Sequence, residues 1–299
     1  MAKKYPLFTE MPLQTAEELW LALSPTNELR PGPYNCIFRG QADSRWPLIP
    51  SILRPRNQPP ITVDGKMVDA SFMVFLELEY LTSFAHHCDN IGIAIPNDSQ
   101  EFRREVMNTQ RADRFFKQPS LWPDERILDL MAMAQHHGVP TRLLDWTTKA
   151  YTAAYFAASS ALSRFNEWEE NDCLAIWALD IELIAHHPEV ILHRSPGAVS
   201  RHLAAQGGLF TVHPHSGFRN GTFVVQGFEN YLSDLPNSPL IKITIPVFES
   251  SKLLKLCSQA GFSAAHIYPS ADGAGRAVID GMNIDGAVMR WNGNKIRVR

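Results

Sequence analysis

The chain has 299 residues, of which 45% are hydrophobic and 20% charged, so it can bury a large core without disulfide or metal support. Its formal charge of −3 gives no general attraction to nucleic acid or to an anionic membrane. The four cysteines form no CxxC pair, which argues against a zinc cage and against a disulfide-rich secreted scaffold. No apolar run approaches the roughly 18 residues of a membrane span, so we expect a soluble, cytoplasmic protein without a membrane partner.

The first half of the chain is expected to be mainly helical. Thr15 can cap a short amphipathic helix over 14–24, and residues 34–38 are typical of a short strand. Prolines leave residues 46–60 room for only a turn, or for one helical turn around 51–53. The spacing of apolar residues then predicts a helix over 68–87. The polar and basic residues 99–118 are expected to continue as an exposed helix, and Asp124 or Asp129 to start another that runs to about Ala134.

The second half contains the clearer strands. A helix over 149–164 precedes a buried strand over 173–179, and residues 240–247 alternate as a strand does. Residues 250–259 are expected to form a helix, and the last 30 residues to form short strands and turns. The fold class is therefore α+β: a single compact domain, with helices mainly in the first half and a mostly antiparallel sheet.

The first candidate site residue is Arg39, which follows the predicted strand at 34–38 and precedes Gly40. The planar guanidinium of an arginine can bind a phosphate or a carboxylate through two parallel hydrogen bonds. A glycine beside it lets a ligand or another backbone segment come close. The alternative is an arginine that pairs with a carboxylate and closes a structural corner.

The densest cluster of polar side chains lies in residues 135–147. His136 and Asp145 are positioned to form a base and its orienting carboxylate, as general acid–base catalysis requires. Alternatively, Gln135 and His136 satisfy buried backbone groups at a turn. The adjacent side chains of His136 and His137 point about 100° apart on a regular helix, so no metal site is expected.

The second part of this cluster combines charges with an aromatic ring. Arg142 and Asp145 are expected to form an internal ion pair over Trp146, which can be purely structural because a buried charge needs a partner. Asp145 or Thr147 can also cap the helix that follows from Lys149, whose N-terminus would attract anions. Capping and phosphate binding are compatible.

A third candidate lies at residues 206–210. Gly207 and Gly208 indicate a turn that enters a strand, with Gln206 at its mouth. A glutamine there can position a ligand through hydrogen bonds, but it cannot act as a general base.

These three stretches together resemble the FRG family, named for an (F/Y)RG motif near its N-terminus. The matching segments are, in order, FRGQ at 38–41 with WPLIPSILR at 46–54, QHHGVPTRLLDWT at 135–147 with AYFA at 154–157, and QGGLF at 206–210. The second segment is long and unusual, which makes the resemblance specific. It implies an FRG domain over 31–280, a helical lead-in at 1–30 and a C-terminal strand or tail at 281–299, with no assigned activity.

A weaker resemblance, in the order of the motifs, is to mono-ADP-ribosyltransferases. It implies an ADP-ribosyltransferase-like fold in which Arg39 holds the phosphates or ribose of NAD, Thr147 braces the site, and Gln206 takes the place of the catalytic acid. The chain departs from that family's pattern, because it has no Ser-Thr-Ser segment and no Glu-x-Glu pair at the late position. A glutamine cannot stabilise an oxocarbenium-like centre as a carboxylate does.

From these residues we predict a pocket for a small phosphate-bearing ligand, NAD or another nucleotide, with ADP-ribosyl transfer or NAD cleavage as the candidate reaction. NAD would be a substrate, and no other cofactor is expected. One alternative is a non-catalytic module that binds a nucleotide, nucleic acid or protein; another is a buried structural network around Arg39, Arg142 and Asp145. The predicted catalytic residues are His136, Asp145 and Gln206, and the predicted ligand-binding residues are Arg39, Gln41, Arg54, Gln135, Arg142, Trp146, Thr147 and Phe210.

Overall fold

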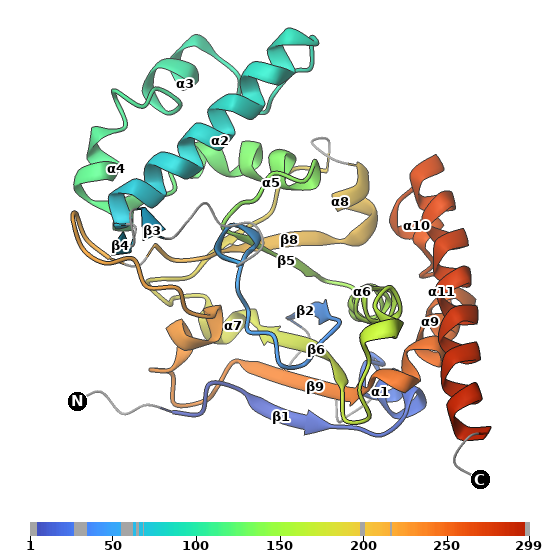
Figure 1. The fold of residues 1–299 in the computed structure, drawn as a ribbon. Helices are drawn as coiled ribbons and strands as arrows, with labels where there is room; N and C mark the ends of the chain where they lie inside the picture. The colour runs from blue at the N-terminus through green and yellow to red at the C-terminus, as the bar shows by residue number, and fades with distance from the viewer. Residues whose placement is uncertain are drawn as a thin grey trace.

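A seven-stranded sheet forms the centre of the molecule (Figure 1). The computed structural model describes residues 5–26, 35–54, 62–63, 66–67, 69–197, 201–215 and 217–296. The strand order is β1-β9-β6-β2-β5-β8-β7, where β1 runs parallel to β9 and the other neighbours are antiparallel. The strands are β1 Thr9–Pro12, β2 Cys36–Gln41, β5 Leu143–Thr147, β6 Cys173–Asp180, β7 Ile191–His193, β8 Gly208–Val212 and β9 Leu240–Pro246; β3 Thr62–Val63 and β4 Lys66–Met67 pair separately. The predicted α+β class with a mostly antiparallel sheet is confirmed.

In chain order, the helices are interspersed with the strands. They are α1 Ala16–Ala22, α2 Ala70–Asn90, α3 Gln100–Glu105, α4 Asp113–Lys117, α5 Leu128–His136, α6 Ala150–Leu162, α7 Ile181–Ile184, α8 Arg201–Gln206, α9 Ser250–Gln259, α10 Ala264–Ile267 and α11 Ala271–Ile296. The predicted cap of α1 is confirmed. The Thr15 side chain accepts from the backbone N–H of Glu18, and the Glu18 carboxylate accepts from the backbone N–H of Thr15. The predicted single turn at Ser51–Leu53 is also confirmed, as a 3₁₀ turn.

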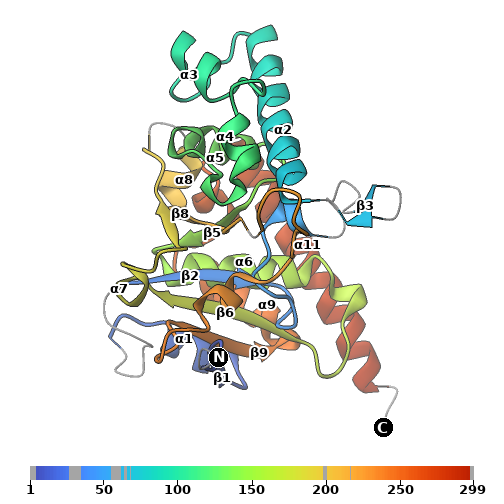
Figure 2. The same ribbon diagram turned by 90° about the vertical axis from the view of Figure 1, so that its left-hand side faces the viewer.

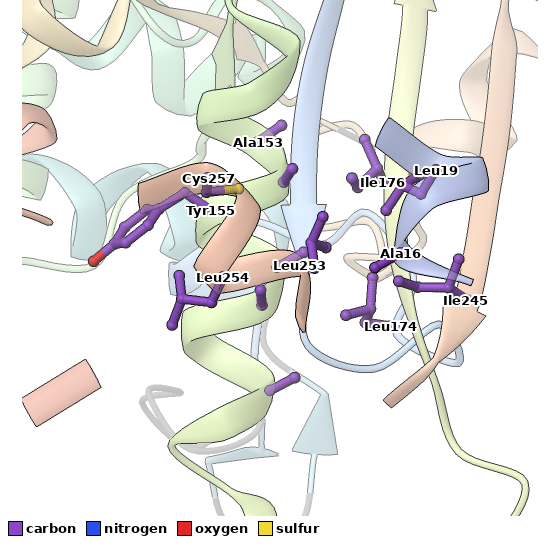
Figure 3. Packing of buried hydrophobic residues seen from close by; sticks show 14 of the residues in the cluster. Ala16, Leu19, Ala153, Tyr155, Leu174, Ile176, Ile245, Leu253, Leu254 and Cys257 are labelled. Atoms are coloured by element: carbon purple, nitrogen blue, oxygen red, sulfur yellow. The ribbon is translucent and has the colours of Figure 1, made fainter. Parts of the chain in front are cut away.

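Two groups of helices cover one face of the sheet. α6 lies over β2 and β6, where Ala153, Leu174 and Ile176 pack with residues of α1 and α9 (Figure 3). α2 and α5 cover β5 and β8 through a second apolar cluster that includes Leu143 and Phe210, and Figure 2 shows them with α3 and α4 at one end of the molecule. Trp146 and Trp177 belong to a third cluster with Ile37 and Leu48, on the opposite face.

Gly40 is the point at which α6 crosses β2. A Cβ atom built on Gly40 would lie 2.1 Å from the backbone oxygen of Ala153 and 2.7 Å from the backbone nitrogen of Ala157. The predicted close approach is therefore made by a helix of the same chain, whose small alanine side chains let its backbone come this near to the strand.

Three local predictions are wrong. The last 30 residues form no strands among those described; residues 271–296 are the single helix α11, because packing of Ala287 and its neighbours against the core outweighs the low helix propensity of glycine. Residues 99–118 form two short helices separated by a turn at Asn108, whose side chain accepts from the N–H of Gln110. Asp145, predicted as a possible helix cap, lies instead in the middle of strand β5.

Candidate functional site

Arg39 bridges two central strands of the sheet. The ladder between β2 and β5 consists of the pair Phe38–Thr147. Next to it, Nη1 of Arg39 donates to the backbone oxygen of Asp145 at 2.7 Å and lies 3.5 Å from Oδ2 of the same residue. The Arg39 side chain is only 11% exposed, and its buried Nε has no hydrogen-bond partner among the described residues.

Asp145 is a solvent-facing carboxylate in the middle of a buried strand. Its side chain is 62% exposed, although its neighbours along β5 are buried. Gln135, at the end of α5, donates from Nε2 to Oδ1 of Asp145 at 2.6 Å. The hydroxyl of Thr141 donates to Oε1 of Gln135 and so fixes the orientation of that amide. Asp145 was expected to orient His136 as a base; its carboxylate instead accepts from Gln135, and His136 is exposed at the end of α5.

Arg54 brings a second guanidinium to the same place. An open pocket of about 180 Å³ is lined by Arg39, Ser51, Arg54, Gln135, Gly138, Val139, Pro140, Leu143 and Asp145. Nε of Arg54 donates to the backbone oxygen of Ile49 at 3.0 Å. Although part of its side chain is exposed, burial of the guanidinium and then the charge of Arg39 lower the pKa of Arg54 to about 10, which leaves it charged at pH 7. Two cations therefore face one carboxylate.

Arg142 lies away from this pocket, in the core beneath α2. It is 1% exposed, and its Nε donates to Oε2 of Glu77 at 2.6 Å while Nη2 bonds the other carboxylate oxygen. Trp122 donates to the same carboxylate at 2.9 Å. The predicted Arg142–Asp145 ion pair is wrong, because a buried guanidinium needs an equally buried carboxylate, and Asp145 is exposed.

The family model of the FRG domain matches residues 34–165. The chain contains an FRG domain. Comparison with curated proteins and with solved structures finds no match. The polar residues that line the pocket all lie inside the matched segment of the FRG domain; they are Arg39, Ser51, Arg54, Gln135 and Asp145.

Several of the predicted site residues are core residues. Gln41 is buried and accepts from Nε1 of Trp177 at 2.7 Å, and Trp146 is buried and donates to the hydroxyl of Thr211 at 2.9 Å. Phe210 is 2% exposed and packs in the cluster under α2 and α5. These contacts give Gln41, Trp146 and Phe210 structural roles and no place in the lining of the pocket.

Thr147 and Gln206 meet at the N-terminal end of α6, beside the pocket rather than in it. The hydroxyl of Thr147 donates to the backbone oxygen of Gln206 at 2.6 Å and accepts from the N–H of Lys149 at 2.9 Å. The N-cap of α6 is Lys149, so the prediction that Asp145 or Thr147 is the N-cap is wrong. The side chain of Gln206, which follows the matched FRG segment, donates to the backbone oxygen of Ile267 at 3.4 Å.

Two residues of the site region were not predicted from the sequence. Ser51 lines the pocket and exchanges hydrogen bonds with the backbone of Thr141. Glu77 is the partner of Arg142. The sequence could have indicated it, because Glu77 is a lone acidic residue on the buried face of α2, between Val74 and Leu81. Among the described residues, no three His, Cys, Asp or Glu side chains gather as a metal site.

We expect His213 to make the stability of this protein depend on pH. It is 1% exposed, and burial together with the charge of Arg142 lowers its pKa to about 3. An unfolded histidine has a pKa near 6.5, so below that pH the unfolded chain binds a proton that the folded chain rejects. We expect the free energy of unfolding to fall by about 2 kcal/mol between pH 7 and pH 5 from this residue alone.

Urea denaturation at both pH values measures the effect. His213→Gln, which removes the titrating group, should lose about 2 kcal/mol of that pH dependence. His186→Gln is the matched control, because His186 is exposed and should leave the dependence unchanged. Equal pH dependence in the native protein and His213→Gln would contradict the assignment.

Proposed function

We propose that the pocket formed by Arg39, Arg54 and Asp145 binds a small phosphate-bearing ligand, with NAD or another nucleotide as the expected class. The observation that carries the proposal is the charge balance. Two guanidinium groups, one of them with an unpartnered buried Nε, share a single carboxylate. An anion would offset the excess positive charge, and charge-assisted hydrogen bonds from guanidinium groups to phosphate are the strong ones.

The size of the pocket limits how much of such a ligand it encloses. Sites that enclose whole drug-sized ligands have volumes of about 300–1,000 Å³, whereas this pocket has about 180 Å³. It accommodates a phosphate with its sugar, and the base of a nucleotide would lie over the open rim. Asp145, held by Gln135 and exposed to solvent, is the acceptor available for a sugar hydroxyl.

A second candidate function, cleavage of NAD, is favoured by the exposure of Asp145. In this reaction the bond between nicotinamide and ribose breaks, nicotinamide leaves with the bonding electrons, and water or a target hydroxyl adds to the ribose carbon and releases a proton. A carboxylate beside that carbon stabilises the positive charge that develops. Asp145 supplies the carboxylate that Gln206 lacks, and it does so inside the pocket.

We expect Arg54→Ala and Arg39→Lys each to weaken ADP and NAD binding about 10- to 100-fold, the loss of one charge-assisted hydrogen bond of about 1.5–3 kcal/mol. Isothermal titration calorimetry with NAD, ADP and adenosine measures it, since adenosine shares the base and sugar but has no phosphate. Arg104→Ala is the control, because Arg104 is an exposed arginine on α3. Equal affinity for adenosine and ADP, or no binding of any phosphate-bearing ligand by the native protein, would refute the proposal.

The same titrated samples decide between binding and catalysis. If the site cleaves NAD, nicotinamide accumulates in the native protein, and Asp145→Asn stops its release while ADP still binds. NAD binding without nicotinamide release by the native protein supports the alternative of a non-catalytic nucleotide-binding module.

A further inference from the structure

We propose that Thr141, which does not itself line the pocket, sets the specificity of the pocket for the sugar of its ligand, a role that rests on the proposed function. Thr141 lies in the segment between α5 and β5, two elements that lie side by side (Figure 1). Its residue is 2% exposed, so it can act on a ligand only through the residues that it contacts. Two of these residues, Gln135 and Ser51, line the pocket.

Hydrogen bonds give the hydroxyl group of Thr141 a fixed direction. Its oxygen, Oγ1, accepts from the backbone N–H of Leu143 at 3.2 Å, and the hydroxyl donates to Oε1 of Gln135. The amide of Gln135 is thereby turned so that Nε2 faces Oδ1 of Asp145, at 2.6 Å. The opposite orientation of the amide would set its oxygen against the carboxylate. Because the bonds all run in one direction, each polarises and strengthens the next, and the hydroxyl of Thr141 holds the carboxylate through Gln135.

The result is a donor and an acceptor held side by side for a hydroxyl group. Nε2 of Gln135 carries two hydrogens, and only one of them has an acceptor among the described residues. The carboxylate of Asp145 has about four acceptor positions, of which Gln135 occupies one, and it is exposed to solvent. A sugar hydroxyl can therefore donate to Asp145 and accept from Gln135 at once. A phosphate group is bound by the guanidinium groups of Arg39 and Arg54 instead.

The main chain of Thr141 supports the other half of the pocket. Its N–H donates to Oγ of Ser51 at 3.0 Å, and its oxygen accepts from the Ser51 hydroxyl and from the N–H of Ile52, both at 3.2 Å. These bonds hold the 3₁₀ turn that directly precedes Arg54. A valine at position 141 keeps all three bonds, because they involve only the main chain of that residue. Thr141→Val therefore removes the hold on Asp145 and leaves the guanidinium groups in place.

Isothermal titration calorimetry with ribose 5-phosphate and pyrophosphate tests this proposal, since only the first ligand carries a sugar. Thr141→Val should weaken ribose 5-phosphate binding about 5- to 10-fold, the effect of one neutral hydrogen bond, and pyrophosphate binding less than about 2-fold. Thr141→Ser, which keeps the hydroxyl, should bind both ligands as the native chain does. Thr211→Val is the matched control: Thr211 is also buried, and its hydroxyl bonds Trp146 rather than a pocket residue. It should lower the melting temperature without changing the ratio of the two affinities.

A double-mutant cycle tests whether Thr141 acts through Gln135. Gln135→Leu removes the amide, so the addition of Thr141→Val should weaken ribose 5-phosphate binding no further. Additive losses, or a Thr141→Val variant that loses both ligands equally or loses neither, would overturn the positioning role and leave the proposed function intact. A native chain that binds ADP but not ribose 5-phosphate would do the same. A native chain that binds neither of these ligands nor pyrophosphate would refute the proposed function and the role of Thr141 with it.

Discussion

Glu77→Ala is expected to lower the free energy of unfolding by about 3–5 kcal/mol, the cost of breaking a buried ion pair by removing one partner. The carboxylate is 2% exposed and binds both Arg142 and Trp122. Without it the guanidinium of Arg142, itself 1% exposed, would remain charged in the core, and among the described residues its remaining acceptor is the backbone oxygen of His213. Because this pair joins α2 to the segment before β5, its loss is also expected to loosen α2 against that segment.

The measurement is urea denaturation followed by circular dichroism. Glu79→Ala is the matched control, two residues along the same helix but exposed, and its effect should stay within about 0.5 kcal/mol. Equal stability of the two variants would mean that Arg142 is not held by Glu77. A chain with Glu77→Leu and Arg142→Leu together should be more stable than Glu77→Ala, since it leaves no buried charge.

Gly40→Ala is expected to cost about 3 kcal/mol or more, at the upper end of the penalties for overpacking. The new Cβ would lie 2.1 Å from the backbone oxygen of Ala153. The atom in its way belongs to the main chain of α6, so no side-chain rotation relieves the collision, and the helix has to move away from β2. The melting temperature should fall strongly, and the adjacent Arg39–Asp145 contact should be disturbed with it.

Two controls separate a backbone collision from ordinary crowding. Gly197→Ala adds a methyl group at normal contact distance, 3.4 Å from the Ala204 Cβ, and should change stability little. Ala157→Gly in the Gly40→Ala background removes a methyl group near the site but leaves the Ala153 oxygen in place, so it should not restore stability. Full rescue by Ala157→Gly would show that side-chain crowding, rather than the backbone, requires glycine here.

Local sequence patterns were sufficient where an element is defined by its own residues. Thr15 and Glu18 lie three residues apart and can complete a capping box by themselves. The alanines of α6 and the unbroken apolar run of β6 also show in the sequence which elements are buried. Such patterns fail for α11, whose glycines argue against a helix until the packing partners of its inner face are known.

The ion-pair partners of the charged residues could not be predicted from local sequence patterns. Arg142 and Asp145 are close in sequence with opposite charges, yet Arg142 binds Glu77, which is 65 residues away. Burial decides this, because an ion deep in the core is stabilised by a carboxylate that is equally removed from water. For the same reason Asp145, at the surface, is held by Arg39 and by Gln135.

The sequence by itself determined that this chain has an α+β fold and that it contains an FRG domain, whose matched segment includes Arg39 and residues 135–147. These properties follow from short patterns and from motifs that are contiguous in the chain. Only the tertiary structure decided which motif residues share the pocket and which support the core. Arg39, Arg54, Gln135 and Asp145 line the pocket, while Gly40, Gln41, Arg142 and Trp146 have structural contacts. That division depends on burial and on contacts between distant segments, which neither spacing nor composition contains.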